Sequence, residues 1–358
     1  MSALPPLGAI TPRRIALIKP SALGDIVHTL PVLSALRRRF PEAFLAWVVN
    51  RAYEPLIAGH PDLDATLPFD RGAVRARGGC RRHGRDSPSI APWAGQFDLV
   101  LDLQGLLRSG LMTWATGAAR RVGLAGAREG SRLFYTDVIA DPGRGGLHAV
   151  DRYWRVAEAL GAGDGPKESR LPVDPTAAEW AETMLHPWPR PWLMVSVGSR
   201  WYTKRWPPAH FADVLTRATA DFGGTAVFLG GSDETALAAA VRGRLTSPSL
   251  DLTGRTSLPQ LAAVLARADV MLANDTGPLH LAVALGRPVV APYTCTKAAL
   301  TGPYGQRQHV VETQVRCGGS YRKRCARLEC MTELAPARLW PVLREVLQGW
   351  YCQSRRVS

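Results

Sequence analysis

The chain has 358 residues, of which 46% are apolar, and a formal net charge of +14. This length exceeds one compact core and fits two domains of ordinary size, and the apolar fraction is enough to fill both. No apolar run approaches the roughly 18 residues that a membrane-spanning helix needs, and the first residues lack the apolar region of a signal peptide. We therefore expect a protein that is neither secreted nor membrane-spanning, located in the cytoplasm.

The first half of the chain alternates short apolar strands with amphipathic helices. The predicted strands cover residues 14–18, 44–49, 65–69, 98–103 and 121–124. Helices are predicted from residue 26 to the arginines before Pro41, near 52–58, from the Gln104-Gly105 turn to about 116, and over 149–160. In the first helix Ile26, Leu30 and Leu33 share one face at spacings i, i+4 and i+7. Residues 71–96, which are rich in Gly, Arg and Pro, predict a long loop.

The second half repeats this pattern after a Gly- and Pro-rich stretch at 161–175, which we expect to be the linker. Strands are predicted at 192–197, 225–229, 249–252, 270–273 and 289–292, and helices at 176–185, 208–220, 234–244, 258–268, 277–285 and 336–347. Regular strand–helix alternation predicts a parallel sheet in each half, hence an α/β protein with two doubly wound, Rossmann-like domains facing a central cleft. We expect domains at 1–175 and 176–335, with the segment 336–358 forming a helix that packs back on the first domain.

The positive charge is concentrated in two segments. Residues 71–85 contain six arginines and no acid, and residues 297–358 contain eleven Lys or Arg against four acids. A localised basic surface suits an anionic partner, either a phosphorylated lipid or a nucleic acid, although a solvated arginine-rich loop has the same composition.

Three of the six cysteines, Cys317, Cys325 and Cys330, are clustered near several basic residues. Zinc sites usually show C-x2-4-C pairs and four ligands, and this spacing fits neither condition. We expect no bound metal. Ordinary buried thiols are the simplest interpretation, with a disulfide or a reactive pair as the alternatives.

Two turns that lead from a strand into a helix carry candidate functional residues. The first contains Asp25, which caps its helix in the simplest interpretation and could also act as a general base. A helix N-terminus lowers the pKa of an aspartate, so this group would be ionised at neutral pH. His28, one turn further, is either its partner or a surface residue.

The second turn contains Asp275, Thr276 and Gly277, followed one turn later by His280. The first three form a plausible helix start, and the same groups suit phosphate binding because a hydroxyl and backbone N–H groups converge there. His280 could bind a phosphate or sugar, or could be a satisfied core residue. Lys204 also follows a strand and precedes a helix, so it would reach the carboxyl ends of the strands and could neutralise a diphosphate.

Five segments spread along nearly the whole chain carry a resemblance to a known family. They are 19–31 (KPSALGDIVHTLP), 97–106 (FDLVLDLQGL), 204–207 (KRWP), 230–234 (GGSDE) and 275–281 (DTGPLHL). In this ordered set the sequence resembles the ADP-heptose:lipopolysaccharide heptosyltransferases of glycosyltransferase family 9, whose fold is GT-B. The resemblance is to the type I enzymes, although residues 199–202, 292–297 and 317–330 depart from the pattern of that family.

The resemblance implies an inverting transferase that moves a heptose from ADP-heptose to a Kdo-like inner-core sugar of a lipopolysaccharide or similar lipid. Asp25 would be the catalytic base and Lys204 would hold the donor phosphates. The expected donor-binding residues are Ser199, Arg200, Lys204, Glu234, Asp275, Thr276, Gly277 and His280. The reaction would need no cofactor or metal, because helix N-termini and Lys204 supply the positive field.

The basic loop lies where members of this family are expected to meet their anionic, lipid-linked acceptor. The expected acceptor-binding residues are Ser21, Gly24, His28, Arg71, Arg75, Arg77 and Gln104. A lipid-linked acceptor also implies peripheral contact with the cytoplasmic face of the inner membrane.

Three other functions remain as alternatives. The same fold could use another nucleotide sugar or acceptor. The high net charge could belong to a nucleic-acid-binding protein, although the chain shows no zinc-finger, helix-turn-helix or aromatic RNA-binding pattern. A catalytically silent family member is disfavoured by the presence of both Asp25 and Lys204.

Overall fold

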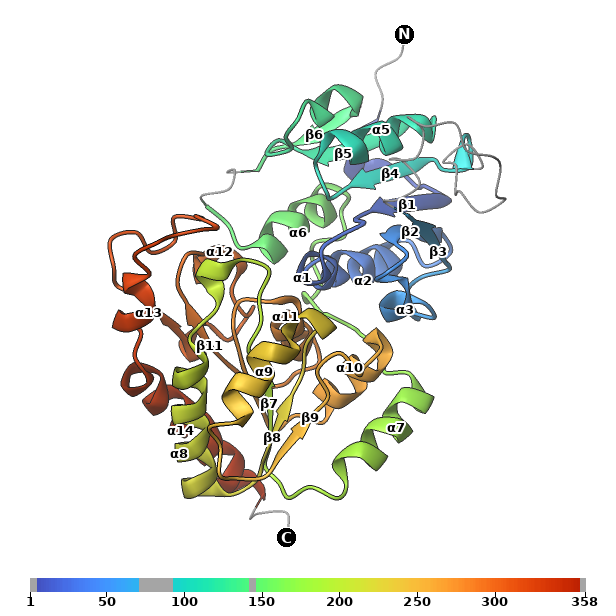
Figure 1. Ribbon diagram of the computed structural model, residues 1–358. Helices are drawn as coiled ribbons and strands as arrows, with labels where there is room; N and C mark the ends of the chain where they lie inside the picture. Colours follow the sequence, from blue (N-terminus) through green and yellow to red (C-terminus); the bar gives the residue numbers. More distant parts are fainter. Residues whose placement is uncertain (1–4, 71–92, 142–145, 355–358) are drawn as a thin grey trace, which may run out of the picture. The chain divides into compact units, whose positions relative to one another are not determined.

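The structure is a computed structural model that describes residues 5–70, 93–141 and 146–354 (Figure 1). It divides into two compact units, Met1–Pro172 and Val173–Ser358. The division falls inside the predicted linker, close to the expected boundary at residue 175.

The first unit contains a six-stranded parallel sheet in the order β3-β2-β1-β4-β5-β6. Its strands are β1 (Arg14–Ile18), β2 (Phe44–Asn50), β3 (Ala65–Phe69), β4 (Leu99–Asp102), β5 (Arg120–Leu124) and β6 (Asp137–Ile139). Its helices are α1 (Leu23–Val27), α2 (Leu30–Arg39), α3 (Glu54–Ile57), α5 (Leu107–Ala115) and α6 (Ala149–Ala159), with 3-10 turns η1 (Leu7–Ala9) and η4 (Ser131–Phe134).

The second unit has a sheet of the same type, in the order β12-β11-β10-β7-β8-β9. Its strands are β7 (Trp192–Ser196), β8 (Thr225–Phe228), β9 (Ser249–Asp251), β10 (Val270–Ala273), β11 (Val289–Tyr293) and β12 (Val310–Glu312). Its helices are α7 (Pro175–Leu185), α8 (Pro208–Phe222), α9 (Thr235–Arg242), α10 (Leu258–Ala266), α11 (Gly277–Ala284), α12 (Ala298–Thr301), α13 (Glu329–Glu333) and α14 (Pro336–Ser354), with 3-10 turns η6 (Tyr202–Lys204), η7 (Ser232–Glu234) and η8 (Arg307–His309).

Each sheet has one point at which the strand order reverses. In the first unit β1 and β4 are neighbours, and the chain continues from them to opposite sides of the sheet. In the second unit β7 and β10 have the same relationship. Open parallel sheets bind ligands outside the carboxyl ends of such strand pairs, because the loops that follow diverge and leave room. The segments that carry Asp25, Gln104, Lys204 and Asp275 all follow these four strands.

The helix predicted from residue 26 to the arginines before Pro41 is two helices, α1 and α2. Residues 28 and 29 interrupt the helical pattern. Pro31 lies in the first turn of α2, where its missing N–H costs nothing, but it could not donate a hydrogen bond inside one continuous helix. At the break between the two helices, the hydroxyl of Thr29 donates to the Asp25 carbonyl at 2.9 Å.

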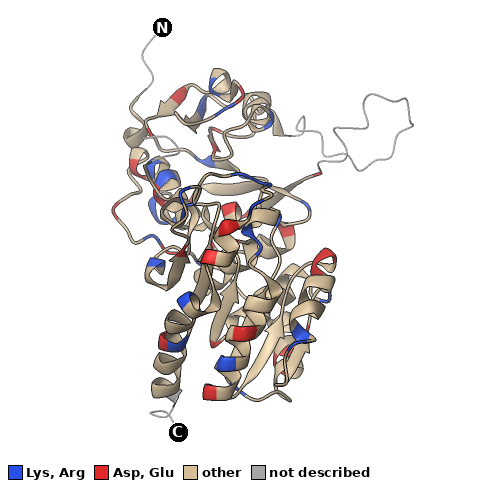
Figure 2. Cartoon of the chain, turned by 60° about the vertical axis from the view of Figure 1, so that its left-hand side comes forward, with Lys and Arg blue, Asp and Glu red and all other residues tan. Residues whose placement is uncertain are grey.

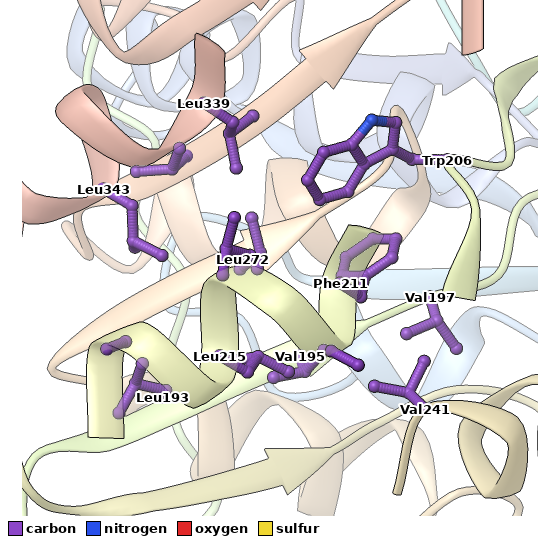
Figure 3. Packing of buried hydrophobic residues seen from close by; sticks show 14 of the residues in the cluster. Leu193, Val195, Val197, Trp206, Phe211, Leu215, Val241, Leu272, Leu339 and Leu343 are labelled. Atoms are coloured by element: carbon purple, nitrogen blue, oxygen red, sulfur yellow. The ribbon is translucent and has the colours of Figure 1, made fainter. Parts of the chain in front are cut away.

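Helix α14 packs on the second unit, so the prediction that it packs on the first domain is wrong. Leu339, Leu343 and Leu347 are completely buried in the core that β7, α8 and β10 form (Figure 3). Trp206 lies in the same core, and its indole N–H donates to the Leu334 carbonyl at 2.6 Å. The apolar face of α14 is therefore used within its own unit, where burial of each leucine contributes about 1.5–3 kcal/mol.

In the view of Figure 2, basic and acidic residues are interspersed along the helices of the described parts of both units. Within these parts, no helix combines the length and apolar character that crossing a membrane requires.

Candidate active site

Asp25 lies in the first turn of α1, just after the loop that follows β1. It is the third residue of the helix, and Ala22 occupies the N-cap position. Asp25 Oδ2 accepts a hydrogen bond from the Ala22 N–H at 3.3 Å. The carboxylate therefore stabilises the start of the helix, but from the third helical position and not as the N-cap that the sequence predicts. Its side chain is 41% exposed. An acceptor hydroxyl could approach it from solvent.

A buried lysine and a buried tyrosine hold this carboxylate. Lys19 Nζ lies 3.7 Å from Asp25 Oδ1 and donates to the Tyr153 hydroxyl at 2.8 Å and to the Leu103 carbonyl at 2.9 Å. The Tyr153 hydroxyl in turn donates to Asp25 Oδ1 at 3.1 Å. Three elements, β1, α1 and α6, thus converge on one carboxylate.

These contacts fix the charge states of the group. Desolvation by the surrounding protein would raise the pKa of Asp25. The Lys19 charge, the Ala22 N–H and the Tyr153 hydroxyl outweigh this effect and lower the pKa below its ordinary value. Burial would lower the pKa of Lys19, but Asp25 and Tyr153 raise it above its ordinary value. Asp25 is therefore a carboxylate and Lys19 a cation at neutral pH.

A pocket adjoins this network. Its cavity volume is about 60 Å³, and its lining includes Gln104, Arg128, Asp141, Arg152 and Tyr153. Gln104 Oε1 is buried there and accepts no hydrogen bond from another described residue. Buried polar atoms normally have partners, so this oxygen suits a hydroxyl donor of a ligand, whereas the two arginines suit an anionic group.

The loop that forms this pocket is held by Asp102 at the end of β4. Burial raises the pKa of this carboxyl despite three donors, the N–H groups of Gln104 and Gly105, both at 2.9 Å, and the Tyr135 hydroxyl at 2.6 Å. Gly105 has φ +66°, which a glycine adopts without strain. Asp102 is thus a positioning residue for the Gln104 loop.

The other acceptor residues expected in the first unit lie on or near α1. Ser21 is buried in the turn before it, Gly24 is its second residue, and His28 is buried after its last residue. The ring of His28 packs edge-on against His148 with centroids 5.2 Å apart. Arg71, Arg75 and Arg77 lie outside the described residues.

In the second unit, Lys204 and Asp275 form a direct ion pair. Lys204 Nζ lies 2.7 Å from Asp275 Oδ2, and the same oxygen accepts a hydrogen bond from the Thr296 hydroxyl at 2.7 Å. His280 Nε2 lies 3.6 Å from the other carboxylate oxygen. Burial would raise the pKa of Asp275, but His280 and Lys204 lower it far below its ordinary value. The carboxylate is thus ionised and holds Lys204 in place.

The loop between β7 and α8 is tied to the end of β10. The Ser199 hydroxyl donates to the Asp275 carbonyl at 3.0 Å, and Asn274 bridges the loop by accepting from the Trp206 N–H and donating to the Val197 carbonyl. Lys204 Nζ also lies 4.8 Å from the centre of the Trp201 ring. Arg200 is exposed on this loop.

Helix α11 begins directly beside this ion pair. Thr276 is the extended residue before the helix, and its side chain forms no capping hydrogen bond within the described structure. Gly277 is the first helical residue and has no side chain, and Pro278 after it has no N–H, so the N–H donors of this first turn come from Gly277 and the residues after Pro278. An anion would be stabilised there by the N–H groups and the helix dipole.

Glu234 reaches the same strand ends from the turn after β8. Its Oε2 accepts from the Gly231 N–H at 3.3 Å, and burial raises its pKa. A Cβ built on Gly198 would lie 1.8 Å from Glu234 Oε1, and one on Gly230 would lie 2.3 Å from Oε2. Two glycines at the ends of β7 and β8 therefore make room for this carboxylate.

Several positioning residues could not be read from the sequence. Lys19 is the first residue of the segment 19–31 and follows a predicted strand. This position is the only signal in the sequence that pointed to it. Tyr153 carried no signal beyond its place on an amphipathic helix. Asp275 was expected to contact the donor, and its buried ion pair adds the role of positioning Lys204.

The clustered cysteines have different environments. Cys330 is buried, Cys325 is partly buried and Cys317 is exposed, and all three are free thiols. Burial raises the pKa of Cys330, as do the neighbouring Cys317 and Cys325. The expectation of ordinary buried thiols therefore fits Cys330 alone. Within the described residues, no group of three or more His, Cys, Asp or Glu side chains has an arrangement that could hold a metal ion.

Comparisons with known proteins give a consistent result. Residues 93–331 match the model of glycosyltransferase family 9 (heptosyltransferase). The chain is 30% identical to lipopolysaccharide heptosyltransferase 1 of Pseudomonas aeruginosa over 87% of both chains, and 28% identical to that of Escherichia coli over 83% of this chain and 92% of the relative.

Solved structures share the fold. The E. coli heptosyltransferase WaaC with ADP superposes with a TM-score of 0.73 at 23% identity, over 93% of this chain and 99% of that one. The E. coli ADP-heptose lps heptosyltransferase II gives a TM-score of 0.72 at 22% identity, over 94% and 99%. The two doubly wound units therefore have the GT-B type of fold, and the chain belongs to glycosyltransferase family 9, the heptosyltransferases.

Proposed function

We propose that the protein transfers a heptose from ADP-heptose to a Kdo-like sugar in the inner core of a lipopolysaccharide or similar lipid, with inversion at the anomeric carbon. The relatives are lipopolysaccharide heptosyltransferases, and the E. coli enzyme has been solved with ADP and with ADP-2-deoxy-2-fluoro heptose. The observation that carries the proposal is the partly exposed carboxylate of Asp25, held ionised by Lys19 and Tyr153 beside a polar pocket.

In the proposed reaction, a carboxylate oxygen of Asp25 takes the proton of the acceptor hydroxyl. The hydroxyl oxygen then forms a bond to the anomeric carbon of the heptose, on the face opposite the diphosphate. The bond from that carbon to the phosphate oxygen breaks, and its electron pair leaves with ADP. One displacement on one carbon inverts its configuration, and no covalent enzyme intermediate forms.

The second unit supplies the stabilisation of the leaving group. Lys204 is a positioned cation whose ion pair with Asp275 fixes it before the donor arrives. The N-terminus of α11 adds N–H donors, and such preorganised groups stabilise the charge that develops on a departing diphosphate. Glu234, in its glycine cradle, would contact the nucleoside of the donor. Ser199, Arg200, Thr276, Gly277 and His280 complete the proposed donor site.

The first unit would bind the acceptor. Gln104 and Arg152 line the pocket that reaches the Asp25 network, and an inner-core sugar of the Kdo type carries the carboxylate and hydroxyls that such groups bind. Ser21, Gly24 and His28 belong to the same proposed site, together with Arg71, Arg75 and Arg77 in the basic loop. The lipid part of the acceptor would bring the protein to the cytoplasmic face of the inner membrane.

Substitution of Asp25 by asparagine tests the proposed base. Transfer should fall by about 10²- to 10⁴-fold, the usual contribution of a general base, while ADP affinity should stay unchanged. Asp64→Asn is the matched control, because Asp64 is 40% exposed and forms an ion pair with Arg37 in the same unit. Transfer at the wild-type rate by Asp25→Asn would refute the assignment of the base.

A further inference from the structure

Helix α5 presents large apolar side chains to solvent on the face opposite its buried one. Leu107, Leu111 and Trp114 are 43%, 45% and 61% exposed. Their spacing of i, i+4 and i+7 places them on one stripe of the helix. An ordinary surface helix has the reverse arrangement, with charged residues on this face.

The buried face of the same helix is made of small or flexible residues. Ser109, Gly110, Met112 and Thr113 are its buried members. Gly110 allows close packing, because a Cβ there would lie 2.7 Å from the Phe134 ring and 2.9 Å from Ser131 Cβ. The helix thus packs through its small side and leaves its bulky side uncovered, which core packing does not explain.

The 3-10 turn η4 extends this apolar stripe. Leu133 is 86% exposed, and its turn contacts the Gly110 side of α5. Glu129, just before the turn, accepts a hydrogen bond from the Leu107 N–H at 3.3 Å, so the segment runs along the helix. We call Leu107, Leu111, Trp114 and Leu133 the α5 patch.

Exposed arginines flank the α5 patch. Arg108, Arg128 and Arg132 are exposed, and the Arg108 guanidinium lies 5.9 Å from the centre of the Phe69 ring. Glu129 is the one acidic residue between residues 107 and 134, and it is exposed. A tryptophan and leucines surrounded by arginines match the interface of an anionic bilayer, in which the rings and chains enter the headgroup region and the arginines meet phosphates.

The position of the patch links it to the proposed acceptor pocket. Gln104 and Gly105 line that pocket immediately before α5 begins, and Arg128 lines it shortly before η4. A membrane held at the α5 patch would therefore lie next to the pocket that receives the sugar of a lipid.

We propose that the α5 patch is the surface by which the protein docks on an anionic lipid bilayer, with the flanking arginines contacting lipid phosphates. This inference rests on the proposed function for its role, since docking would present the lipid-linked acceptor to the pocket. The binding itself is independent of the reaction and can be measured without it.

The test is sedimentation of the full-length protein with vesicles of phosphatidylethanolamine and phosphatidylglycerol, and with vesicles of phosphatidylcholine alone. Wild-type protein should bind the anionic vesicles more strongly, and added salt should weaken this binding. The double variant Trp114→Ser/Leu133→Ser should bind about tenfold or more weakly, because it loses two exposed apolar groups. Arg132→Ser should reduce the preference for anionic vesicles.

Two controls distinguish docking from misfolding and from failure of the proposed function. Tyr351→Ser, an exposed aromatic residue of α14, should bind vesicles like the wild type. The double variant should keep its ADP affinity and its transfer to a deacylated, water-soluble acceptor, but its KM for an acceptor embedded in vesicles should rise. If the wild type transfers to neither acceptor, the proposed function fails, and the vesicle sedimentation still tests the patch.

Vesicle binding by the double variant at the wild-type level would overturn the inference. A wild-type protein that binds no vesicles but forms a dimer, which the double variant dissociates, would overturn it as well, because the patch would then join two copies of the chain.

Discussion

At the residue scale, the chemistry of the first unit depends on contacts between distant parts of the chain. Asp25 and Tyr153 are 128 positions apart in the sequence, and their hydrogen bond brings α6 to the start of α1. Lys19 completes the group from the end of β1. A charged residue in a strand-to-helix turn can be found from the sequence, but its partner across the fold cannot, because no local pattern encodes that pairing.

The Tyr153 hydroxyl yields a prediction on pH dependence. Its hydrogen bond lowers the pKa of Asp25, so Tyr153→Phe should raise that pKa. Because the base must be deprotonated, the acidic limb of the profile of kcat/KM against pH should move to higher pH in the variant. The wild-type rate should persist to lower pH. Profiles of both proteins with identical acidic limbs would show that Tyr153 does not act on the base.

The Lys204–Asp275 pair yields a second prediction, on ADP affinity. Lys204→Ala should weaken ADP binding by about 1.5–3 kcal/mol, the usual contribution of a charge-assisted hydrogen bond. Asp275→Asn should also weaken it, because Lys204 loses the partner that positions it. Calorimetry on both single variants and the double variant should give non-additive losses, with the double variant close to the worse single variant. Fully additive losses would mean that the two residues act independently.

At the scale of elements, the site is built at the two points where strand order reverses. The alternation of strands and helices was enough to predict both sheets and to place the candidate turns after β1, β4, β7 and β10. It was not enough for β6, β12, α12 and α13, which were not predicted. Elements of three to five residues are too short to show a hydrophobic period. The break between α1 and α2 was also missed, although Pro31 marked it.

The glycine at the end of β7 gives an element-scale prediction. Gly198→Ala should leave the fold intact, because the clashing atoms belong to the end of the Glu234 side chain, which can swing away. The displaced carboxylate should then lose its proposed contact with the nucleoside, so ADP affinity should fall. Gly223→Ala is unsuitable as a control because its φ is positive; Gly349→Ala, with open space around it, is suitable. Unchanged ADP affinity in Gly198→Ala would remove Glu234 from the donor site.

At the scale of the whole molecule, the sequence predicted two units of one architecture but assigned the last helix to the wrong one. Amphipathicity shows that α14 must bury a face, yet it does not show which core accepts that face. Leu343 is completely buried in the second unit (Figure 3), so Leu343→Ala should reduce the stability of that unit by about 2–5 kcal/mol.

Thermal unfolding with and without ADP checks this assignment. A ligand stabilises the unit that binds it, so ADP should raise the transition of the second unit. Leu343→Ala should lower that same transition. A variant that lowers only the transition insensitive to ADP would contradict either the packing of α14 or the location of the donor site, and Lys204→Ala would then show which of the two is wrong.

The most direct test of the proposed function is the reaction itself. The protein is incubated with ADP-heptose and an inner-core acceptor that ends in a Kdo-like sugar, and the product is analysed by mass spectrometry and by NMR of the new glycosidic bond. We expect one added heptose, release of ADP, and an anomeric configuration opposite to that of the donor. Retention of the donor configuration, or transfer from another nucleotide sugar and none from ADP-heptose, would contradict the proposed function.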